Sequence, residues 1–249
     1  MKRESAIVYG WAPVREAIRA RGRAVRKLLV AREGKRHRLN ELLTEARCAG
    51  IPVHLVSRAV LDRLAPHAAH QGILAYLAAG DYADPEELLE TLPEDVVLVL
   101  LDHVEDPRNL GAILRTAHCA GARAVVIPKD RAAGLTDVVA KTSAGAWVYT
   151  PLVRVTNLAT FCRELRERSI RVIGVEADGP LPYTEVSYVG PVAFVFGSEG
   201  KGLRRLTRAQ CDLLVSIPMK GQITSLNVSV AAGIILFEVL RQRTRRAAS

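Results

Sequence analysis

The chain has 249 residues, 49% of them apolar and 24% charged, and carries a formal net charge of +9. This length and composition suffice for one or two buried cores and exclude intrinsic disorder as the main state. The longest aliphatic stretch near the middle, residues 96–101, is far below the ~18 apolar residues of a membrane-spanning helix, and no apolar signal run opens the chain, so we expect a soluble, cytoplasmic protein without a membrane segment.

Short apolar runs alternate with amphipathic stretches in the first third of the chain. The runs predict strands and the stretches predict helices, which together indicate a small α/β domain over residues 1–78. The predicted strands are residues 7–9, 28–31, 53–56 and 73–77, and the predicted helices are residues 13–20, 39–49 and 58–64.

The whole excess of positive charge lies in this first domain. Residues 1–80 hold 15 Lys and Arg against 6 Asp and Glu, whereas the remainder holds 20 of each kind. Ten of these cations lie between Arg15 and Arg38, a density that attracts a polyanion and favours nucleic acid, although a solvated helix face would carry the same residues. Because Tyr9, Trp11 and Tyr76 are its only aromatic residues, the domain would bind RNA mainly through phosphates and shape.

An acidic stretch, residues 79–95, separates the first domain from the rest and is assigned as a linker. Gly80 and Pro93 bracket this stretch, as expected of a domain boundary. Asp84 followed by Pro85 is typical of an N-cap with proline in the first helical position, which predicts a short helix inside the linker. The second domain then covers residues 96–249.

The second domain reads as a series of strand–helix units. Continuous apolar strands between helices indicate a parallel sheet covered on both faces. The end of the chain, residues 226–243, is apolar over much of its circumference and predicts a buried or interface helix. The predicted strands are residues 96–101, 124–127, 171–175 and 192–196, and the predicted helices are residues 109–120 and 157–168.

The four cysteines lie more than forty residues apart in the sequence, at Cys48, Cys119, Cys162 and Cys211. This spacing forms neither a zinc knuckle nor a redox pair. We therefore expect buried free thiols and no metal site.

Three polar segments each begin with the end of a strand, at the sheet edge where parallel sheets bind ligands. The first runs from Leu101 to Thr116, the second is glycine-rich and covers residues 195–203, and the third, residues 216–233, leads into the last helix. The second segment is not a Walker loop, because Lys201 is followed by Gly202, and it lacks the glycine spacing of dinucleotide sites. The alternative is purely structural, with a capping asparagine in the first segment and a tight turn in the second.

Together these segments closely resemble the three motifs of the SpoU (TrmH) family of RNA ribose 2′-O-methyltransferases. The matching residues occur in the order that the family shows, and the first domain resembles the small substrate-binding domain of the large-subunit rRNA guanosine methyltransferase branch. The matching runs are residues 106–111 with Arg115, residues 196–202, and residues 217–219 through 225–229.

The resemblance implies an S-adenosylmethionine-dependent enzyme that methylates a guanosine ribose in 23S rRNA, with residues 1–80 binding folded RNA. It also implies a SPOUT-type parallel sheet with a trefoil knot, although topology rules alone favour an unknotted sheet. A homodimer with the last helix at its interface is expected. The alternatives are a tRNA guanosine 2′-O-methyltransferase and a non-catalytic RNA-binding or ribosome-assembly factor.

The resemblance assigns the site residues as well. Gly197, Ile217 and Leu226 would enclose the methyl donor mainly through backbone groups and apolar contact. The polar active-site positions of the family correspond here to Asn109, Arg115, Glu199, Ser225 and Asn227.

The proton acceptor is left open by the sequence. The family proposals make the arginine a base, but a guanidinium stays protonated in proteins. We therefore assign Arg115 to the developing alkoxide or the adjacent phosphate, with Glu199 as an alternative proton acceptor. His103 and His118 are less favoured bases, because the family pattern does not require them. The basic terminus, Arg241, Arg243, Arg245 and Arg246, would contact phosphates or form a solvated tail.

Overall fold

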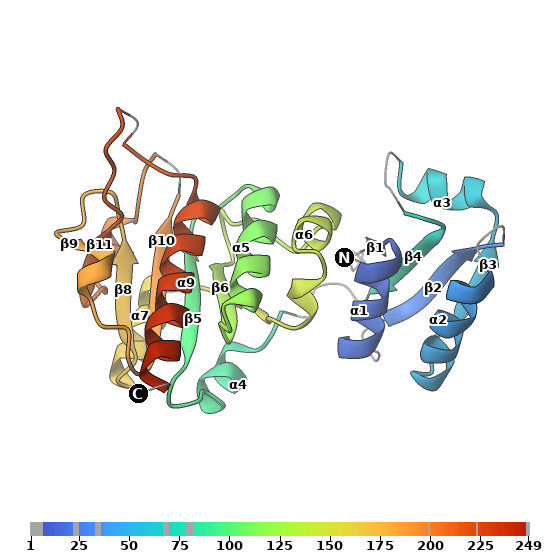
Figure 1. The fold of residues 1–249 in the computed structure, drawn as a ribbon, viewed down its shortest axis with the longest axis horizontal. Coiled ribbons are helices and arrows are strands. Elements are labelled where there is room, and N and C mark those ends of the chain that lie inside the picture. Colours follow the sequence, from blue (N-terminus) through green and yellow to red (C-terminus); the bar gives the residue numbers. More distant parts are fainter. Residues whose placement is uncertain are drawn as a thin grey trace. The chain divides into compact units, whose positions relative to one another are not determined.

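The computed structural model describes residues 7–21, 25–32, 36–66, 70–77, 82–198, 200–222 and 224–247. The chain divides into two compact units, each with its own sheet (Figure 1). Residues 1–81 and 134–149 form the first unit, and residues 82–133 and 150–249 form the second.

The first unit has a four-stranded sheet in the order β1-β4-β2-β3. β4 runs antiparallel to β1 and β2, while β2 and β3 are parallel. Its strands are β1 (Ile7–Tyr9), β2 (Val25–Ala31), β3 (Val53–Val56) and β4 (Ile73–Leu77), and its helices include α1 (Trp11–Arg21), α2 (Arg36–Cys48) and α3 (Arg58–Leu64). The predicted α/β character is confirmed, and β2 begins at Val25 rather than Leu28 because Val25 and Lys27 also pair with β4, across a bulge.

Residues 134–149 belong to the first unit although they come from the middle of the chain. This segment contains α6 (Asp137–Thr142) and a 3-10 turn, η2 (Ala146–Val148). The Tyr149 hydroxyl donates to the Glu16 carboxylate of α1, and a Cβ on Gly145 would lie 3.5 Å from the Glu16 Cβ. The sequence patterns predicted one uninterrupted second domain and no helix here.

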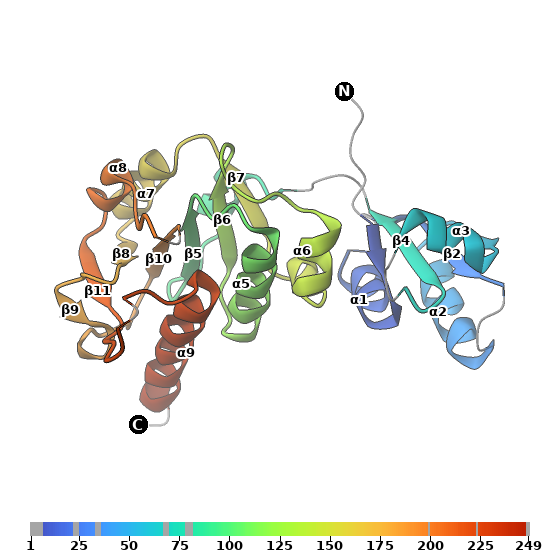
Figure 2. The ribbon, with the colours of Figure 1, turned by 90° about the horizontal axis from the view of Figure 1, so that it is seen from above.

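The second unit contains a seven-stranded parallel sheet in the order β7-β6-β5-β10-β8-β11-β9. Figure 2 shows α5 and α9 on one face of this sheet and α7 and α8 on the other. The strands are β5 (Val97–Asp102), β6 (Ala124–Pro128), β7 (Leu152–Val155), β8 (Arg171–Val175), β9 (Leu181–Pro182), β10 (Val192–Gly197) and β11 (Leu213–Ser216). The helices are α4 (Pro85–Glu90), α5 (Pro107–Cys119), α7 (Leu158–Glu167), α8 (Arg205–Arg208) and α9 (Val228–Ala247), with a 3-10 turn η3 (Tyr183–Glu185). The parallel sheet covered on both faces is as predicted, while the trefoil knot stays a prediction.

Side-chain caps set where the helices of this unit begin. The Asp84 carboxylate accepts from the backbone N–H of Glu86 at 2.8 Å, which confirms the predicted short helix. Asp106 accepts from the Arg108 N–H at 2.8 Å, so α5 begins at Pro107, two residues earlier than predicted. Asn157 caps α7 by accepting from the Thr160 N–H at 3.1 Å.

Arg243 anchors the C-terminal helix α9, whereas the sequence predicted phosphate contacts or a solvated tail for this residue. The Arg243 guanidinium donates to the backbone carbonyls of Gly190 at 2.6 Å, Tyr188 at 3.3 Å and Asp95. Its burial lowers the pKa of the guanidinium from the ordinary value. Arg243 therefore holds α9 against the loop before β10. Among the described helices, none combines the length and the apolar character needed to cross a membrane.

Candidate active site

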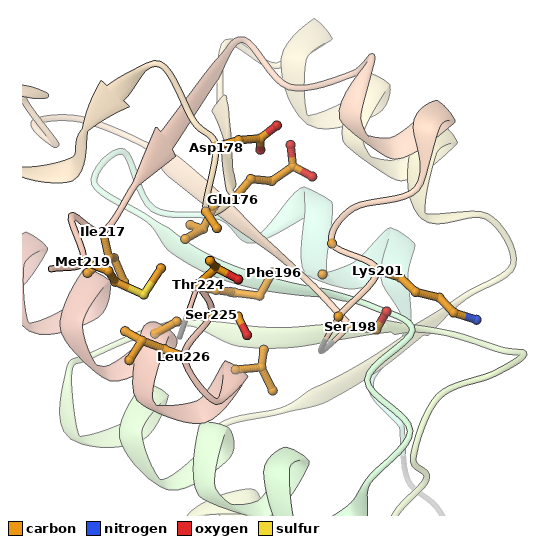
Figure 3. A pocket seen from close by; sticks show the side chains of 17 residues that line it. Glu176, Asp178, Phe196, Ser198, Lys201, Ile217, Met219, Thr224, Ser225 and Leu226 are labelled. Carbon is orange, nitrogen blue, oxygen red and sulfur yellow. The ribbon is translucent and has the colours of Figure 1, made fainter. Parts of the chain in front are cut away.

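A cavity of about 400 Å³ opens at the carboxyl ends of β8, β10 and β11, beside the first turn of α9 (Figure 3). This volume is typical of small-molecule sites, and the position is where parallel sheets place their ligands. All three strands end at the same edge because they run parallel in register, with Phe196 of β10 opposite Val175 of β8 and Val215 of β11 opposite Val175.

The cavity has an apolar wall and a polar wall. Figure 3 shows Ile217, Met219 and Leu226 on one side, with Glu176 and Asp178 on another. The apolar lining consists of Val175, Ala177, Phe196, Ile217, Met219, Leu226, Val228 and Ala231, and the rest consists of Glu176, Asp178, Gly197, Ser198, Gly200, Lys201, Gly202, Thr224 and Ser225. Such a lining suits a ligand that combines a flat apolar ring with a few polar groups.

The two ends of the glycine-rich loop after β10 approach each other so closely that a side chain does not fit between them. Gly202 donates its N–H to the Ser198 carbonyl at 3.0 Å, which folds the loop back over Gly197. A Cβ on Gly197 would lie 2.2 Å from the carbonyl carbon of Gly202, so no other residue fits there. Gly200 and Gly202 have φ of 81° and 64°, which L-residues with side chains rarely adopt.

Four of the eight predicted site residues line this cavity. Gly197, Ile217, Ser225 and Leu226 come from the second and third motifs and meet around the same space. Leu226 is 37% exposed, which leaves its side chain open to a ligand. The structure thus brings the three predicted donor-binding residues together, and their role in binding a methyl donor stays a prediction.

The two predicted asparagines form a pair that joins two helices. Asn227 Nδ2, just before α9, donates to Asn109 Oδ1, in the first turn of α5, at 3.0 Å. Asn227 Oδ1 in turn accepts from the Ser229 N–H at 3.0 Å and from the Ser229 hydroxyl at 2.5 Å. Because Asp106 caps α5, the alternative reading of Asn109 as the helix cap is wrong.

Arg115 and Glu199 are not placed at the cavity by the structure. Arg115 is exposed on α5. Glu199 lies outside the residues that the structure describes. The roles of both residues stay predictions.

The two histidines near the first motif lie in different environments. His103 directly follows β5 with φ of 63°, and burial together with the nearby Arg204 lowers the pKa of its imidazole. His118 lies in the last turn of α5, about 13 Å along the helix axis from Asn109, and its Nδ1 lies 3.3 Å from the Thr150 hydroxyl. This distance separates His118 from the asparagine pair.

Two acidic residues after β8 were not predicted as site residues. Glu176 lines the cavity, and its carboxylate accepts from the Leu203 N–H at 3.0 Å and from Arg208 Nε at 2.7 Å. Asp178 lines the same wall and is exposed. Both follow a correctly predicted strand, the same signal that marked the three motifs, and could have been found by it. Within the described ranges, no group of three or more His, Cys, Asp and Glu side chains could hold a metal ion.

Comparison with known protein families matches both parts of the chain. Residues 95–237 match the SpoU rRNA Methylase family, and residues 7–83 match the domain described as RNA 2′-O ribose methyltransferase substrate binding.

Known relatives and solved structures match nearly the full length. A Haemophilus influenzae protein named 23S rRNA (guanosine-2′-O-)-methyltransferase RlmB is 46% identical over 219 residues, covering 87% of this chain and 88% of its own. A Shewanella oneidensis protein of the same name is 41% identical, covering 98% and 99%. The SpoU methyltransferase AviRb from Streptomyces viridochromogenes, solved in complex with the cofactor AdoMet, superimposes with a TM-score of 0.83 at 28% identity, covering 97% of this chain and 91% of AviRb.

Proposed function

Because the chain belongs to the SpoU rRNA methylase family, we propose that it is an S-adenosylmethionine-dependent enzyme that methylates the ribose 2′-oxygen of a guanosine in 23S rRNA. The observation that carries this proposal is the convergence of Gly197, Ile217 and Leu226, from two distant motifs, on one cavity of about 400 Å³. The relatives at 41–46% identity over most of the chain support 23S rRNA as the substrate.

The lining of the cavity suits the methyl donor. Ile217, Leu226 and Val228 offer an apolar surface for an adenine ring, and the glycine loop presents backbone groups to which a ligand can approach closely. When bound, S-adenosylmethionine supplies a methyl group on a positively charged sulfur. The carboxylates of Glu176 and Asp178 suit the positive charge of such a ligand.

The polar residues act on the acceptor. A ribose 2′-hydroxyl is a weak nucleophile, so the site must hold its oxygen close to the methyl carbon and accept its proton. The Asn227–Asn109 hydrogen bond fixes the two helix starts next to the loop that carries Ser225. Arg115 stays protonated and would stabilise the developing alkoxide or an adjacent phosphate, while Glu199 is the proposed proton acceptor.

The first unit would bind RNA along β2. Arg26 and Arg32 are exposed, and the Lys27 ammonium lies 4.5 Å from the centre of the Tyr76 ring. Arg15 and Arg19 are less available, because both donate to the Glu45 carboxylate at 2.9 Å. This difference in availability favours phosphate contacts along β2 and at Arg32 over contacts from α1.

The exposed apolar face of α9 suits a homodimer. Val230 is 49% exposed, Phe237 50% and Leu240 37%, an unusual density for a solvated helix. We expect the wild-type chain to sediment as a dimer and Phe237→Glu as a monomer, whereas an unchanged dimer would place the interface elsewhere. A 23S rRNA substrate favours a cytoplasmic location.

The test of function is a map of ribose methylation across rRNA and tRNA, in cells with and without the gene. We expect one guanosine of 23S rRNA to lose its 2′-O-methyl group when the gene is absent. Loss in a tRNA would favour the tRNA alternative. An unchanged map would favour a non-catalytic RNA-binding or ribosome-assembly factor.

A further inference from the structure

Two buried carboxylates hold the returning half of the glycine-rich loop, residues 200–204, from both sides. Asp102 lies at the end of β5, and Glu176 directly follows β8. We propose that Asp102 and Glu176 are positioning residues that fix this segment in the shape that receives the methyl donor. The inference rests on the proposed function and adds to it two residues outside the runs that match the family motifs.

The sheet places both carboxylates at the point where the loop leaves β10. β10 lies between β5 and β8 in the strand order. Gly197, the last residue of β10, is opposite Asp102, and the preceding Phe196 is opposite Val175. Glu176 therefore occupies the next position on the other side of Gly197. The two acids flank the same residue of the central strand.

Each carboxylate binds one backbone N–H of the loop and one arginine. Asp102 Oδ2 accepts from the Arg204 N–H at 2.9 Å, and Asp102 Oδ1 accepts from Arg204 Nε at 2.9 Å. Glu176 Oε1 accepts from the adjacent Leu203 N–H at 3.0 Å, and its Oε2 accepts from Arg208 Nε at 2.7 Å. Two consecutive N–H groups are thus fixed by opposite walls.

Burial makes these hydrogen bonds strong. The Asp102 side chain is fully buried and that of Glu176 is 10% exposed, whereas Arg204 and Arg208 are about half exposed. Hydrogen bonds to ionised acceptors are roughly twice as strong as those between neutral groups, and exclusion of water strengthens them further. The two carboxylates therefore hold the backbone of residues 203 and 204 from the buried side, and the guanidinium groups of Arg204 and Arg208 bind the same carboxylates from the solvent side.

A glycine-rich loop needs such hydrogen bonds to keep a single shape. Gly200 and Gly202 lose more conformational freedom on ordering than other residues would, so an unanchored loop would sample many shapes. A loop already held in its binding shape loses less entropy when the ligand arrives, which raises affinity. The carboxylates thus raise the affinity for the donor by ordering the loop before the donor binds.

The two acids differ in their relation to the ligand. Glu176 lines the cavity and would contact a ligand directly, whereas Asp102 is not among the lining residues. An effect of an Asp102 substitution on donor affinity therefore has to pass through the loop. A substitution of Asp102 therefore distinguishes a positioning role from direct contact with the donor.

The chain contains a matched control at the other end of β8. Asp212 Oδ2 accepts from the Val172 N–H at 2.8 Å, and its Oδ1 accepts from Arg166 Nε at 2.7 Å. This is the same combination of one backbone N–H and one arginine, at the amino end of the sheet and away from the cavity. Asp212→Asn therefore reports the general cost of losing such a carboxylate.

The experiment is calorimetric titration of S-adenosylmethionine into wild type, Asp102→Asn, Arg204→Gln and Asp212→Asn, with the Tm of each. We expect Asp102→Asn to raise the Kd about tenfold and Arg204→Gln, which keeps the backbone hydrogen bond, about threefold. Asp212→Asn should lower Tm with a Kd close to that of wild type. In turnover assays, Asp102→Asn should raise the KM for the donor with little change in kcat.

The possible failures are distinguishable. If Asp102→Asn folds and binds the donor as wild type does, the inference is overturned. The same holds if Asp212→Asn weakens binding equally, because the effect is then a general loss of stability. Should Asp102→Asn not fold, Arg204→Gln decides the matter, since Arg204 is half exposed and an unchanged Kd would overturn the inference. If the wild-type chain binds no S-adenosylmethionine, the proposed function itself fails, and the inference fails with it.

Discussion

The two units of this protein present their functional groups in different ways. The second unit builds a cavity from glycines, apolar side chains and the carboxylates of Glu176 and Asp178, so its binding surface depends on backbone shape. The first unit exposes Arg26 and Lys27 on β2 and Arg32 directly after it, so this surface presents charge rather than a shaped cavity. The difference fits a small ligand in the second unit and a polyanion on the first. A small ligand requires close packing, while phosphates attract cations over longer distances. Substitutions should therefore affect the two kinds of binding independently.

The largest expected effect is that of Gly197→Ala in the second unit. The new Cβ would lie 2.2 Å from the carbonyl carbon of Gly202, and backbone atoms cannot move aside as a side chain can. We expect S-adenosylmethionine binding to fall by about 100-fold or more in calorimetry, while RNA binding stays unchanged. The control is Gly233→Ala in α9, whose Cβ would meet only Thr116 Cγ2 at an ordinary 3.7 Å. Normal donor affinity in Gly197→Ala would remove the loop from the site.

The next effect concerns turnover. Arg115→Ala should lower kcat by about 100-fold or more, as loss of a group that stabilises transition-state charge does, with donor Kd changed by less than about twofold. Arg163→Ala on α7 is the control, because Arg163 is exposed and, among the residues that the structure describes, pairs only with Glu167 at 3.8 Å. The measurement is single-turnover methyl transfer to rRNA. Turnover at the wild-type rate would exclude Arg115 from the catalytic residues.

A smaller effect is expected from the first unit. Reversing two exposed charges, Arg26→Glu with Arg32→Glu, should weaken rRNA binding about tenfold and reduce its salt dependence, because fewer counterions are released. Donor binding should not change. Filter binding at several salt concentrations measures both the affinity and the slope. An RNA affinity that does not depend on salt would contradict the proposed phosphate contacts.

The smallest effect is chemical rather than functional. Burial raises the pKa of the Cys211 thiol to about 12 and that of Cys162 further, whereas Cys48 in the first unit and Cys119 are exposed. Iodoacetamide at pH 8 should therefore label Cys48 and Cys119 first. Because the pKa of Cys211 lies above the working pH, its thiolate fraction and labelling rate should rise about tenfold per pH unit from 8 to 10. Mass spectrometry of labelled peptides checks this order.

Local pattern predicted most of the described strands from their short apolar runs. The bounds of β1, β3, β4 and β8 agree with prediction, and Asp84 caps α4 as expected. β7 was missed; Arg154 interrupts its short apolar run, as His54 interrupts that of β3. The assignment of residues 134–149 to the first unit depends on contacts such as that of Tyr149 with Glu16, 133 positions apart in the chain, which no local pattern contains.

The site likewise contains features that the sequence predicted and features that depend on long-range contacts. Motif order predicted that Gly197, Ile217, Ser225 and Leu226 belong together, and they line one cavity. The Asn109–Asn227 hydrogen bond spans 118 positions, and its geometry depends on how α5 packs against α9. Asp102 and Glu176 each follow a predicted strand, but they were given no role because both lie outside the runs that resemble the family motifs.

Residue order and composition were enough to predict the alternation of strands and helices, the position of the three motifs and the confinement of the excess positive charge to the first third. Which strand ends become neighbours, and hence which carboxylates hold the glycine loop, depends on contacts between distant segments of the chain. The order β5-β10-β8 pairs strands far apart in the chain, so Glu176 and Asp102 reach the backbone N–H groups of Leu203 and Arg204 only in the assembled sheet.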